Sequence, residues 1–476
     1  MNTSRRELIG VALVAVVVVV AWLLVGSYPS YDAYYHLVWG RELFAGQVPS
    51  IGVYQAPTAH PLYLLLGGVL SVIFGSDADR VIVLVALGSL ALCAWSIWRI
   101  GRVMYGTWPG VLAALLTGST ITLLIYAARG FVDLPFLALV FLAAALEAER
   151  RRRGVAVMAL LATAGLLRPE AWVLGGVYWL WCVWPPDPQS GRRSPHLGLL
   201  ALVLAPPLVW VLFDWWAVGE PLYALTATSS LAEELGRPRG LGNVPSTMFD
   251  ALVWVLRAPI LALALVGLVI EAIRRRAVSL YVGGGLVVIG IATYILLGVL
   301  GLSLIPRYLT VTAVALLIFA GYALAGWVEL PSGRLRRGWA AAVALLVVAG
   351  LAVTLVRGDV SGRANDELAF VTGVHSDLVA TLSDPAVIVA LRCGPLTLPT
   401  FSLVPDSLWI LDSANGSVIS RSDRQPRTGV ALVFVDQKAH KRYGTAAGIE
   451  TATDYPPRGF KLIARHGRIA AWARCP

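Results

Sequence analysis

The sequence predicts an all-α polytopic membrane domain with about eleven transmembrane helices, followed by a small C-terminal extracytoplasmic α/β domain. Two observations lead to this fold class. Of the 476 residues, 58% are hydrophobic and 14% are charged, and the mean hydropathy is +0.73, far outside the range of soluble globular domains. Apolar segments of spanning length recur as far as Val356, and beyond it the pattern becomes mixed.

The expected spans follow one another closely along the first three quarters of the chain. We place them at residues 8–26, 79–98, 108–127, 133–148, 155–169, 171–184, 197–218, 250–271, 279–300, 308–327 and 339–356. Residues 61–75 are also apolar, but they number only about fifteen, which is short for a span. We therefore expect an interfacial helix there, in the first outer loop, beginning at Pro61.

The arginines predict the orientation of these helices. If residues 61–75 lie at the interface, every arginine cluster between spans falls on one side, which the positive-inside rule makes cytoplasmic. The clusters are Arg5/Arg6, Arg99/Arg102, Arg150–Arg153, Arg192/Arg193, Arg274–Arg276 and Arg334/Arg336/Arg337. We expect a retained first span with a cytoplasmic N-terminus in the inner or plasma membrane. Residues 27–60, the loop at Asp133, residues 219–249 and the tail are then extracytoplasmic.

The formal net charge of +10 does not indicate a nucleic-acid partner. The arginines stand in short clusters between apolar runs, as they do in membrane proteins whose orientation they set. The expected surroundings are therefore a lipid bilayer. We exclude nucleic acid as a partner.

The tail, residues 358–476, forms the second expected domain, and residues 1–357 form the transmembrane domain. Within the tail we expect a helix at residues 366–382, strands at residues 386–391 and 430–435, and a hairpin through residues 460–474. Cys393 and Cys475 both lie in this domain. In an oxidising compartment a disulfide between them would stabilise a small domain, and the sequence leaves open whether it forms.

An acidic, aromatic stretch, Tyr-Asp-Ala-Tyr-Tyr-His, follows the first span at residues 31–36. Its carboxylate, Asp32, is flanked by Tyr35 and His36 at the predicted outer face, where it is placed to take a proton from a hydroxyl group near the bilayer. Tyr35 and Trp39 follow at helical spacing, as in a short interfacial helix. Alternatively, Asp32 caps that helix. The two roles are compatible.

A second carboxylate, Asp133, begins an otherwise apolar span. Ionisable residues at membrane depth are costly and usually mark a site or a pathway. Arg129 lies four residues earlier, so an ion pair across one helical turn is the alternative explanation. In either case the pair adds an acid and a cation to the face where Asp32 is expected.

Three more segments bring polar residues to that face. Arg168-Pro169-Glu170 interrupts a long apolar stretch, either as part of a site or as a polar hairpin turn. Arg307-Tyr308 opens the tenth expected span. His60 precedes the interfacial helix and is either a site residue or an ordinary loop histidine.

Carboxylates for proton abstraction and arginines for a phosphate leaving group, gathered at one membrane face, fit transfer from a phosphorylated lipid. A transporter or flippase of lipid-linked glycans is the alternative, but it would carry charges near mid-membrane or a repeated half. A scaffold that binds cell-wall polymer is a third interpretation. Charges at span ends on one face favour the transferase.

Five segments carry these residues in order along the membrane domain. They are Asp32-Ala33 with Tyr35 and Arg41-Glu42, His60-Pro61-Leu62, Arg129 with Asp133, Leu167-Arg168-Pro169-Glu170, and Pro306-Arg307-Tyr308-Leu309. The pattern resembles the GT-C superfamily of polyprenyl-phosphate-dependent glycosyltransferases. It looks most like the bacterial aminoarabinose-transferase and protein O-mannosyltransferase branch.

The resemblance implies that residues 1–357 form a catalytic domain that moves a single sugar from a polyprenyl-phosphate donor to an extracytoplasmic hydroxyl, with inversion. The acceptor would be a cell-envelope glycan, a lipid or a protein. Asp32 would be the base, and Asp133 would assist in acceptor or metal binding. Donor phosphate and sugar would be held by Arg129, Arg168, Arg307, His60, Tyr35, Tyr308 and Glu170. Some members hold a divalent cation, Mg or Mn, between the two loop acids, here Asp32 and Asp133.

The chain departs from the family pattern in three ways. Asp32 is followed by Ala33 rather than by a second acid, and a single proline, Pro61, stands where relatives have two. No lysine is available for the phosphate-binding role that some relatives assign to one, because the three lysines all lie near the C-terminus. These departures concern the sugar and the acceptor more than the type of reaction. The high content of Ala, Val, Leu and Arg is typical of high-GC bacteria and favours mannose or arabinofuranose as the donor sugar, that is, a mannosyl- or arabinosyltransferase.

Overall fold

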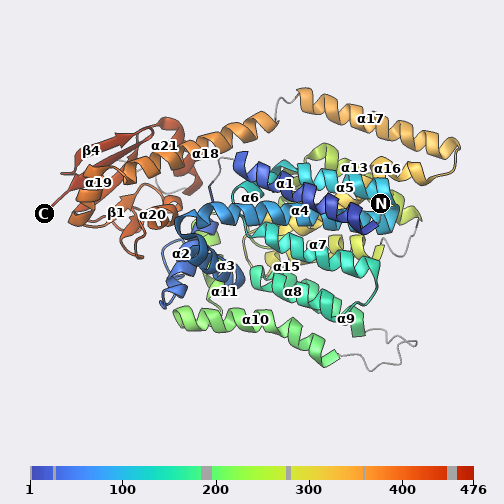
Figure 1. Ribbon diagram of the computed structural model, residues 1–476, viewed down its shortest axis with the longest axis horizontal. Coiled ribbons are helices and arrows are strands. Elements are labelled where there is room, and N and C mark those ends of the chain that lie inside the picture. The colour runs from blue at the N-terminus through green and yellow to red at the C-terminus, as the bar shows by residue number, and fades with distance from the viewer. Residues whose placement is uncertain (1–2, 25–27, 184–195, 275–279, 357–359, 448–457) are drawn as a thin grey trace.

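The computed structural model describes residues 3–24, 28–183, 196–274, 280–356, 360–447 and 458–476. A helical bundle makes up most of the molecule, with most of its helices running along the long axis of the view in Figure 1. The C-terminal domain, orange to red, lies at one end of the bundle, and the N-terminus lies towards the other. A helical membrane domain followed by a small α/β domain is therefore confirmed.

The membrane domain is built from many helices, several of them shorter than a membrane span. They are α1 (Thr3–Leu24), α2 (Tyr31–Phe44), α3 (Pro61–Phe74), α4 (Ala78–Tyr105), α5 (Thr107–Ser119), α6 (Ile121–Ala128), α7 (Asp133–Glu149), α8 (Val155–Leu167), α9 (Glu170–Val183), α10 (His196–Val218), α11 (Tyr223–Glu234), α12 (Val244–Leu256), α13 (Ala258–Arg274), α15 (Gly285–Val299), α16 (Thr310–Ala325) and α17 (Arg334–Val356).

Length and composition allow five of the described helices to cross a membrane, or up to eight if each sharply bent pair counts as one span. The number of eleven spans therefore stays a prediction. The most enclosed candidate is the segment Pro306–Glu329, which contains α16 and of whose apolar window 83% is buried. It packs against α5, α13 and α15 and forms the centre of the bundle.

Two expected spans are broken, so the prediction of one continuous helix in each was wrong. Residues 250–271 form α12 and α13, which meet at Arg257 with a bend of 106°. Pro259 lies in the first turn of α13, where a proline ring fits but cannot continue a preceding helix. Residues 108–127 form α5 and α6, which bend by 53° at Thr120, where the backbone is extended.

The helix that carries Asp32 begins two residues earlier than it would if Asp32 were its cap. Ser30 is the cap of α2, because its hydroxyl accepts a hydrogen bond from the Ala33 N–H at 3.3 Å. Asp32 is therefore a first-turn residue and not the cap. The expected short helix, α3, does begin at Pro61, and Gly75, at φ +56°, ends it before α4. Its interfacial position stays a prediction.

The helices α2 and α3 approach each other backbone to backbone. Gly40 of α2 lies against the Leu64 carbonyl and the Gly68 backbone of α3, and Gly67 lies against the His36 carbonyl. A side chain at either position would collide with main-chain atoms that cannot move independently. This close contact fixes α2, and with it Asp32, against the bundle.

The C-terminal domain is a five-stranded sheet with helices α18 (Val360–Leu382), α19 (Pro385–Ala390), α20 (Val404–Ile410) and α21 (Gln437–Ala447). Its strands are β1 (Leu396–Leu398), β2 (Val418–Ser420), β3 (Gly429–Phe434), β4 (Lys461–His466) and β5 (Ile469–Arg474), in the spatial order β2-β1-β3-β5-β4. The strand β1 runs parallel to β2 and β3, and β5 is antiparallel to β3 and β4. The expected long helix, the strand at residues 430–435 and the final hairpin are confirmed.

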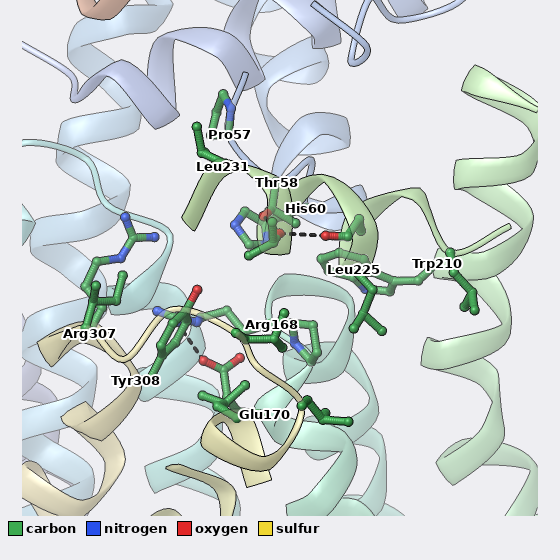
Figure 2. Close-up of a pocket in the computed structure, with 18 of the residues that line it drawn as sticks. Pro57, Thr58, His60, Arg168, Glu170, Trp210, Leu225, Leu231, Arg307 and Tyr308 are labelled. Carbon is green, nitrogen blue, oxygen red and sulfur yellow. Dashed lines mark hydrogen bonds and ion pairs between the residues drawn. The ribbon is translucent and has the colours of Figure 1, made fainter. Parts of the chain in front are cut away.

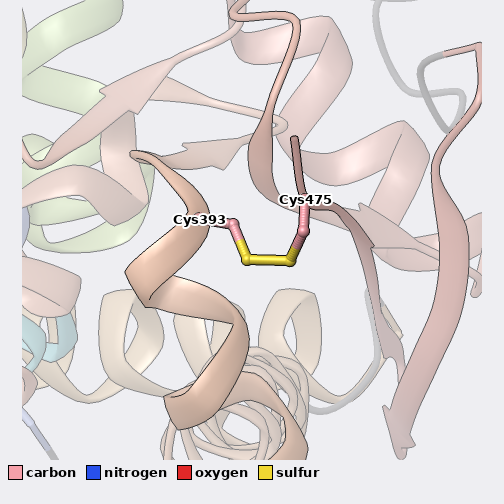
Figure 3. Close-up of a disulfide and its surroundings, with 2 residues drawn as sticks. All are labelled: Cys393 and Cys475. Carbon is pink, nitrogen blue, oxygen red and sulfur yellow. A yellow bond between two sulfur atoms is a disulfide. The ribbon is translucent and has the colours of Figure 1, made fainter.

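The expected strand at residues 386–391 is wrong, because this segment forms α19. Asp384 caps the helix by accepting a hydrogen bond from the Ala386 N–H at 2.8 Å, and Pro385 occupies the first turn. These start signals outweigh the strand preference of the valine- and isoleucine-rich run. After α19 the chain reaches Cys393, which forms a disulfide with Cys475 beyond β5 (Figure 3). The disulfide joins two residues that are 82 positions apart in the sequence and fixes the C-terminus beside the sheet.

The C-terminal domain is joined to α2 by polar side chains. Arg41 pairs with Asp412 and donates a hydrogen bond to the Leu408 carbonyl at 3.2 Å. His375 of α18 stacks on Tyr28, with ring centres 4.0 Å apart. Figure 1 accordingly shows α2 between the bundle and α20. The second domain therefore rests directly on the helix that carries Asp32.

Replacing Gly40 by Val should lower the stability of the folded chain by about 1–3 kcal/mol, the usual cost of overpacking. The new side chain would push α2 away from the α3 backbone. Thermal unfolding of the purified protein in detergent measures the effect. The control is Gly88→Val within α4, where an added Cβ meets nothing within 4 Å. Equal melting temperatures for the two variants would contradict the packing argument.

Candidate active site

A cavity of about 330 Å³ lies where α2, the α8–α9 turn, α10, α11, α15 and the 3-10 turn before α16 (Pro306–Leu309) meet (Figure 2). Part of its wall is polar, and this part includes Asp32, His60, Arg168, Glu170, Arg237, Arg307 and Tyr308. Another part is apolar and includes Trp210, Leu225, Leu231, Leu296, Leu297 and Leu300. Phe401 of the C-terminal domain also lines the cavity. Polar and apolar walls therefore enclose one continuous space.

Five charged side chains alternate in sign beside this cavity. Arg307 Nη1 lies 2.6 Å from Asp32 Oδ2, and Arg307 Nε lies 3.4 Å from Asp133 Oδ2. Arg168 pairs with the other oxygen of Asp133 and, at 2.6 Å, with Glu170 Oε1. Three carboxylates and two guanidinium groups give the cluster a formal charge of −1. It joins the start of α2, the start of α7, the α8–α9 turn and the turn before α16.

Asp133 lies at the centre of this cluster and is buried. Its side chain is fully buried, that of Arg168 is 2% exposed, and Asp133 does not line the cavity. Removing one member of a buried ion pair typically costs about 3–5 kcal/mol, because the other charge is left without compensation. Asp133 therefore holds Arg168 and Arg307 in position and does not itself face the cavity.

Two stacked histidines connect the Asp32 helix to the start of α3. The ring centres of His36 and His60 are 5.2 Å apart. His36 Nε2 accepts a hydrogen bond from the His60 backbone N–H at 2.9 Å, so its Nδ1 carries the proton and donates to the Asp32 carbonyl at 2.6 Å. Burial lowers the pKa of His36 to about 4 and that of His60 well below its usual 6.5. Both rings are therefore neutral near pH 7, and His36 positions the backbone of Asp32.

The structure places two of the predicted site residues elsewhere. Arg129 donates hydrogen bonds to the carbonyls of Tyr28 at 2.9 Å and Pro29 at 3.2 Å, so the expected pair with Asp133 is not formed. Asp133 is instead neutralised by Arg168 and Arg307 from other helices. Tyr35 lies within the protein.

Tyr35 is 2% exposed and stacks on Trp39, with ring centres 4.9 Å apart. The residue of this helix that lines the cavity beside Asp32 is Tyr31, which meets Phe401 edge to face at 5.7 Å. The remaining predicted residues, Asp32, Asp133, His60, Arg168, Glu170, Arg307 and Tyr308, do come together.

Sequence reasoning missed Arg237, which lines the cavity from the segment between α11 and α12. Arg168 and Arg307 are each paired with carboxylates, whereas Arg237 has no ion pair within 4 Å among the described residues. It belongs to the run Gly236-Arg237-Pro238-Arg239 in the long loop already predicted to lie outside. The cation content of that loop was the signal that could have identified it.

The two loop acids do not fit a divalent cation in this arrangement. The Arg307 guanidinium lies between Asp32 and Asp133 and contacts both, so a metal ion would have to displace a positive charge. Among the described residues, no three His, Cys, Asp or Glu side chains are grouped for metal binding.

Comparison with known proteins gives two kinds of similarity. The family model of dolichyl-phosphate-mannose-protein mannosyltransferases matches residues 57–210. ArnT from Cupriavidus metallidurans bound to undecaprenyl phosphate is similar in structure, with a TM-score of 0.58 and 17% identity over 97% of each chain. The apo form of ArnT from the same organism has a TM-score of 0.56 and 17% identity over 98% of each chain. A search of curated proteins found no match.

The chain has the same fold as ArnT over nearly its whole length. This fold and the family match over residues 57–210 agree with the resemblance of its motifs to the GT-C superfamily. The mannosyltransferase family match and the fold together support a multi-pass membrane glycosyltransferase. At 17% identity the likeness to ArnT concerns the fold alone.

The stability of the folded chain should fall as the pH drops from 6.5 towards 4. The folded protein keeps His36, with its pKa of about 4, neutral in this range, whereas the unfolded chain, whose histidine has a pKa near 6.5, takes up a proton. Stability is then lost at up to about 1.4 kcal/mol per pH unit. Melting temperatures between pH 7.5 and 4.5 measure the slope. His36→Asn should reduce it, while His60, whose pKa burial also lowers, keeps its own contribution. An unchanged slope in that variant would count against the neutral, buried His36.

Proposed function

We propose that this chain transfers a single sugar from a polyprenyl-phosphate donor to a hydroxyl group of an acceptor. The observation that carries the proposal is the cavity, whose polar wall contains Asp32 and the unpaired Arg237 and whose apolar wall continues between α10, α11 and α15. A lipid-linked sugar has the same division into a charged, polar head and a hydrocarbon chain. The fold of ArnT, which has been seen with undecaprenyl phosphate, agrees with this proposal.

In the proposed reaction Asp32 is the general base. It accepts the proton of the acceptor hydroxyl while the hydroxyl oxygen attacks the anomeric carbon of the donor. The bond between that carbon and the phosphate oxygen breaks, and the lipid phosphate leaves with the bonding electrons. Attack from the face opposite the phosphate inverts the anomeric carbon. Arg307 orients the carboxylate by binding Oδ2, and the Asp32 side chain stays 15% exposed at the cavity wall.

The leaving phosphate requires a cation that is not already neutralised. Arg168 and Arg307 share three carboxylates, whereas Arg237 has no such partner among the described residues. A planar guanidinium binds two phosphate oxygens at once and stays charged in a partly desolvated site. We therefore assign the phosphate contact to Arg237 and a positioning role to Asp133, Arg168 and Glu170.

For the donor sugar we propose mannose or arabinose. A panel of decaprenyl- and undecaprenyl-linked mannose, arabinose, glucose and galactose would distinguish them. Export or flipping of lipid-linked glycans is the alternative function. The Asp32 carboxylate separates the two, because a transporter has no need of a base at the cavity wall.

Replacing Asp32 by Asn should abolish sugar transfer while leaving donor binding intact. The amide keeps the size of the side chain but cannot accept the proton, and loss of a general base typically lowers the rate about 10²–10⁴-fold. Transfer of radiolabelled sugar in membrane vesicles measures the rate, and retention of labelled donor by purified protein measures binding.

Asp77→Asn is the matched control, because Asp77 is an exposed carboxylate between α3 and α4, outside the cavity. Undiminished transfer by Asp32→Asn would refute the base assignment. Unchanged movement of lipid-linked glycan across vesicles by the same variant, with no transfer by the wild type, would instead favour a transporter.

Replacing Arg237 by Gln should raise the KM for the donor about 10- to 100-fold, because a hydrogen bond to a charged group contributes about 1.5–3 kcal/mol. Arg239→Gln is the control, since Arg239 lies two residues away and pairs with Glu233 on the surface. Initial rates at varied donor concentration give KM and kcat separately. A KM that is the same for both variants would mean that the donor phosphate lies elsewhere.

A further inference from the structure

The helix α17 stands apart from the rest of the bundle. Figure 1 shows it along one edge, beyond α13 and α16. None of its apolar window, Arg334–Ala352, is buried. Near one end, Trp339 donates a hydrogen bond to the Ala323 carbonyl at 2.9 Å and meets Tyr322 edge to face at 5.4 Å. Towards the other end, Gly350 lies against Pro259 of α13.

Between these two contacts lies a groove of about 440 Å³. Its walls come from α13, the end of α16 and α17, and its lining residues include Leu263, Val266, Ile270, Ala342, Val343 and Leu346. From Leu335 to Leu346 the α17 wall is about 16 Å long at the helical rise of 1.5 Å per residue. Half of a bilayer's hydrocarbon core is about 15 Å thick. The groove therefore has the length of one lipid acyl chain in one leaflet.

One end of this groove carries a cation. Arg274, in the last turn of α13, lines the groove and donates a hydrogen bond to the Tyr322 hydroxyl at 3.0 Å. Its guanidinium lies 5.9 Å from the Trp339 ring centre, so an aromatic ring of the type that anchors helices at the headgroup level stands beside it. No carboxylate lies within 4 Å of Arg274 among the described residues, which leaves this charge available to an anion.

We propose that the groove between α13 and α17 is a binding site for an anionic phospholipid. One acyl chain lies along Val266, Ile270 and Val343, and the headgroup phosphate binds Arg274. The lipid fills the space that the two end contacts of α17 leave open, and it thereby joins this helix to the bundle. The positive charge at the groove's end favours an anionic headgroup over a zwitterionic one.

The test uses the full-length chain in detergent, to which phosphatidylglycerol or phosphatidylcholine with identical acyl chains is added, followed by native mass spectrometry. We expect one retained phosphatidylglycerol per chain. Arg274→Gln should weaken its binding about five-fold, the effect of one arginine at an anionic surface, and Arg274→Lys should largely restore it. Ala342→Trp should also weaken binding, because the indole would occupy the groove while Arg274 stays in place.

Arg102→Gln is the matched control, because Arg102 also lies beside a tryptophan, Trp98, but outside the groove. It should bind phosphatidylglycerol as the wild type does. Equal weakening by Arg102→Gln and Arg274→Gln, or equal retention of phosphatidylcholine, would overturn the proposal. So would a dimer whose formation Ala342→Trp prevents, since a second copy of the chain would then occupy the groove. Melting temperatures of all variants separate loss of lipid from loss of folding.

Discussion

Arg307 holds together two carboxylates that would otherwise repel each other at the centre of the site. It contacts Asp32 at 2.6 Å and Asp133 at 3.4 Å, and Asp133 in turn pairs with Arg168. Because burying any one of these charges alone would cost several kcal/mol, the positions of α2, α7, α8 and α16 are mutually constrained. The arrangement of the helix ends around the cavity depends on this alternation of charge. The packing of the same helices away from the cavity depends on apolar contacts.

The site is assembled from both domains and from segments far apart in sequence. Asp32 is fixed by the glycine-mediated packing of α2 on α3 and by the hydrogen bond from His36 to its carbonyl. The C-terminal domain binds α2 through Arg41 and adds Phe401 to the cavity wall. A structural change in the C-terminal domain can therefore be transmitted to Asp32, the proposed base, through α2. It needs no contact with the lipid portion of the donor.

Much of this could be predicted from the sequence, because composition and charge act over whole segments. Apolar runs identify helices, and ionisable residues at their ends identified most of the cluster around Asp32 and Asp133. Pairing could not be predicted in this way: Arg129 is closest to Asp133 in sequence, but Arg168 and Arg307 reach it in space. Local backbone breaks were also missed, since the bend at Arg257 and the helix capped by Asp384 depend on single residues within otherwise apolar runs.

The formal charge of the cluster explains why a further cation is needed and where it has to come from. Two arginines that neutralise three carboxylates leave the cluster with one negative charge, which would repel a phosphate. Adding a third arginine to the same buried network would only strengthen its internal pairing. Arg237 instead comes from the segment between α11 and α12, outside the network, where its charge stays available. Arg168 and Arg307 stabilise the site, and Arg237 is the cation proposed to bind the substrate. Because these roles belong to different residues, the site can be rigid and still bind an anion.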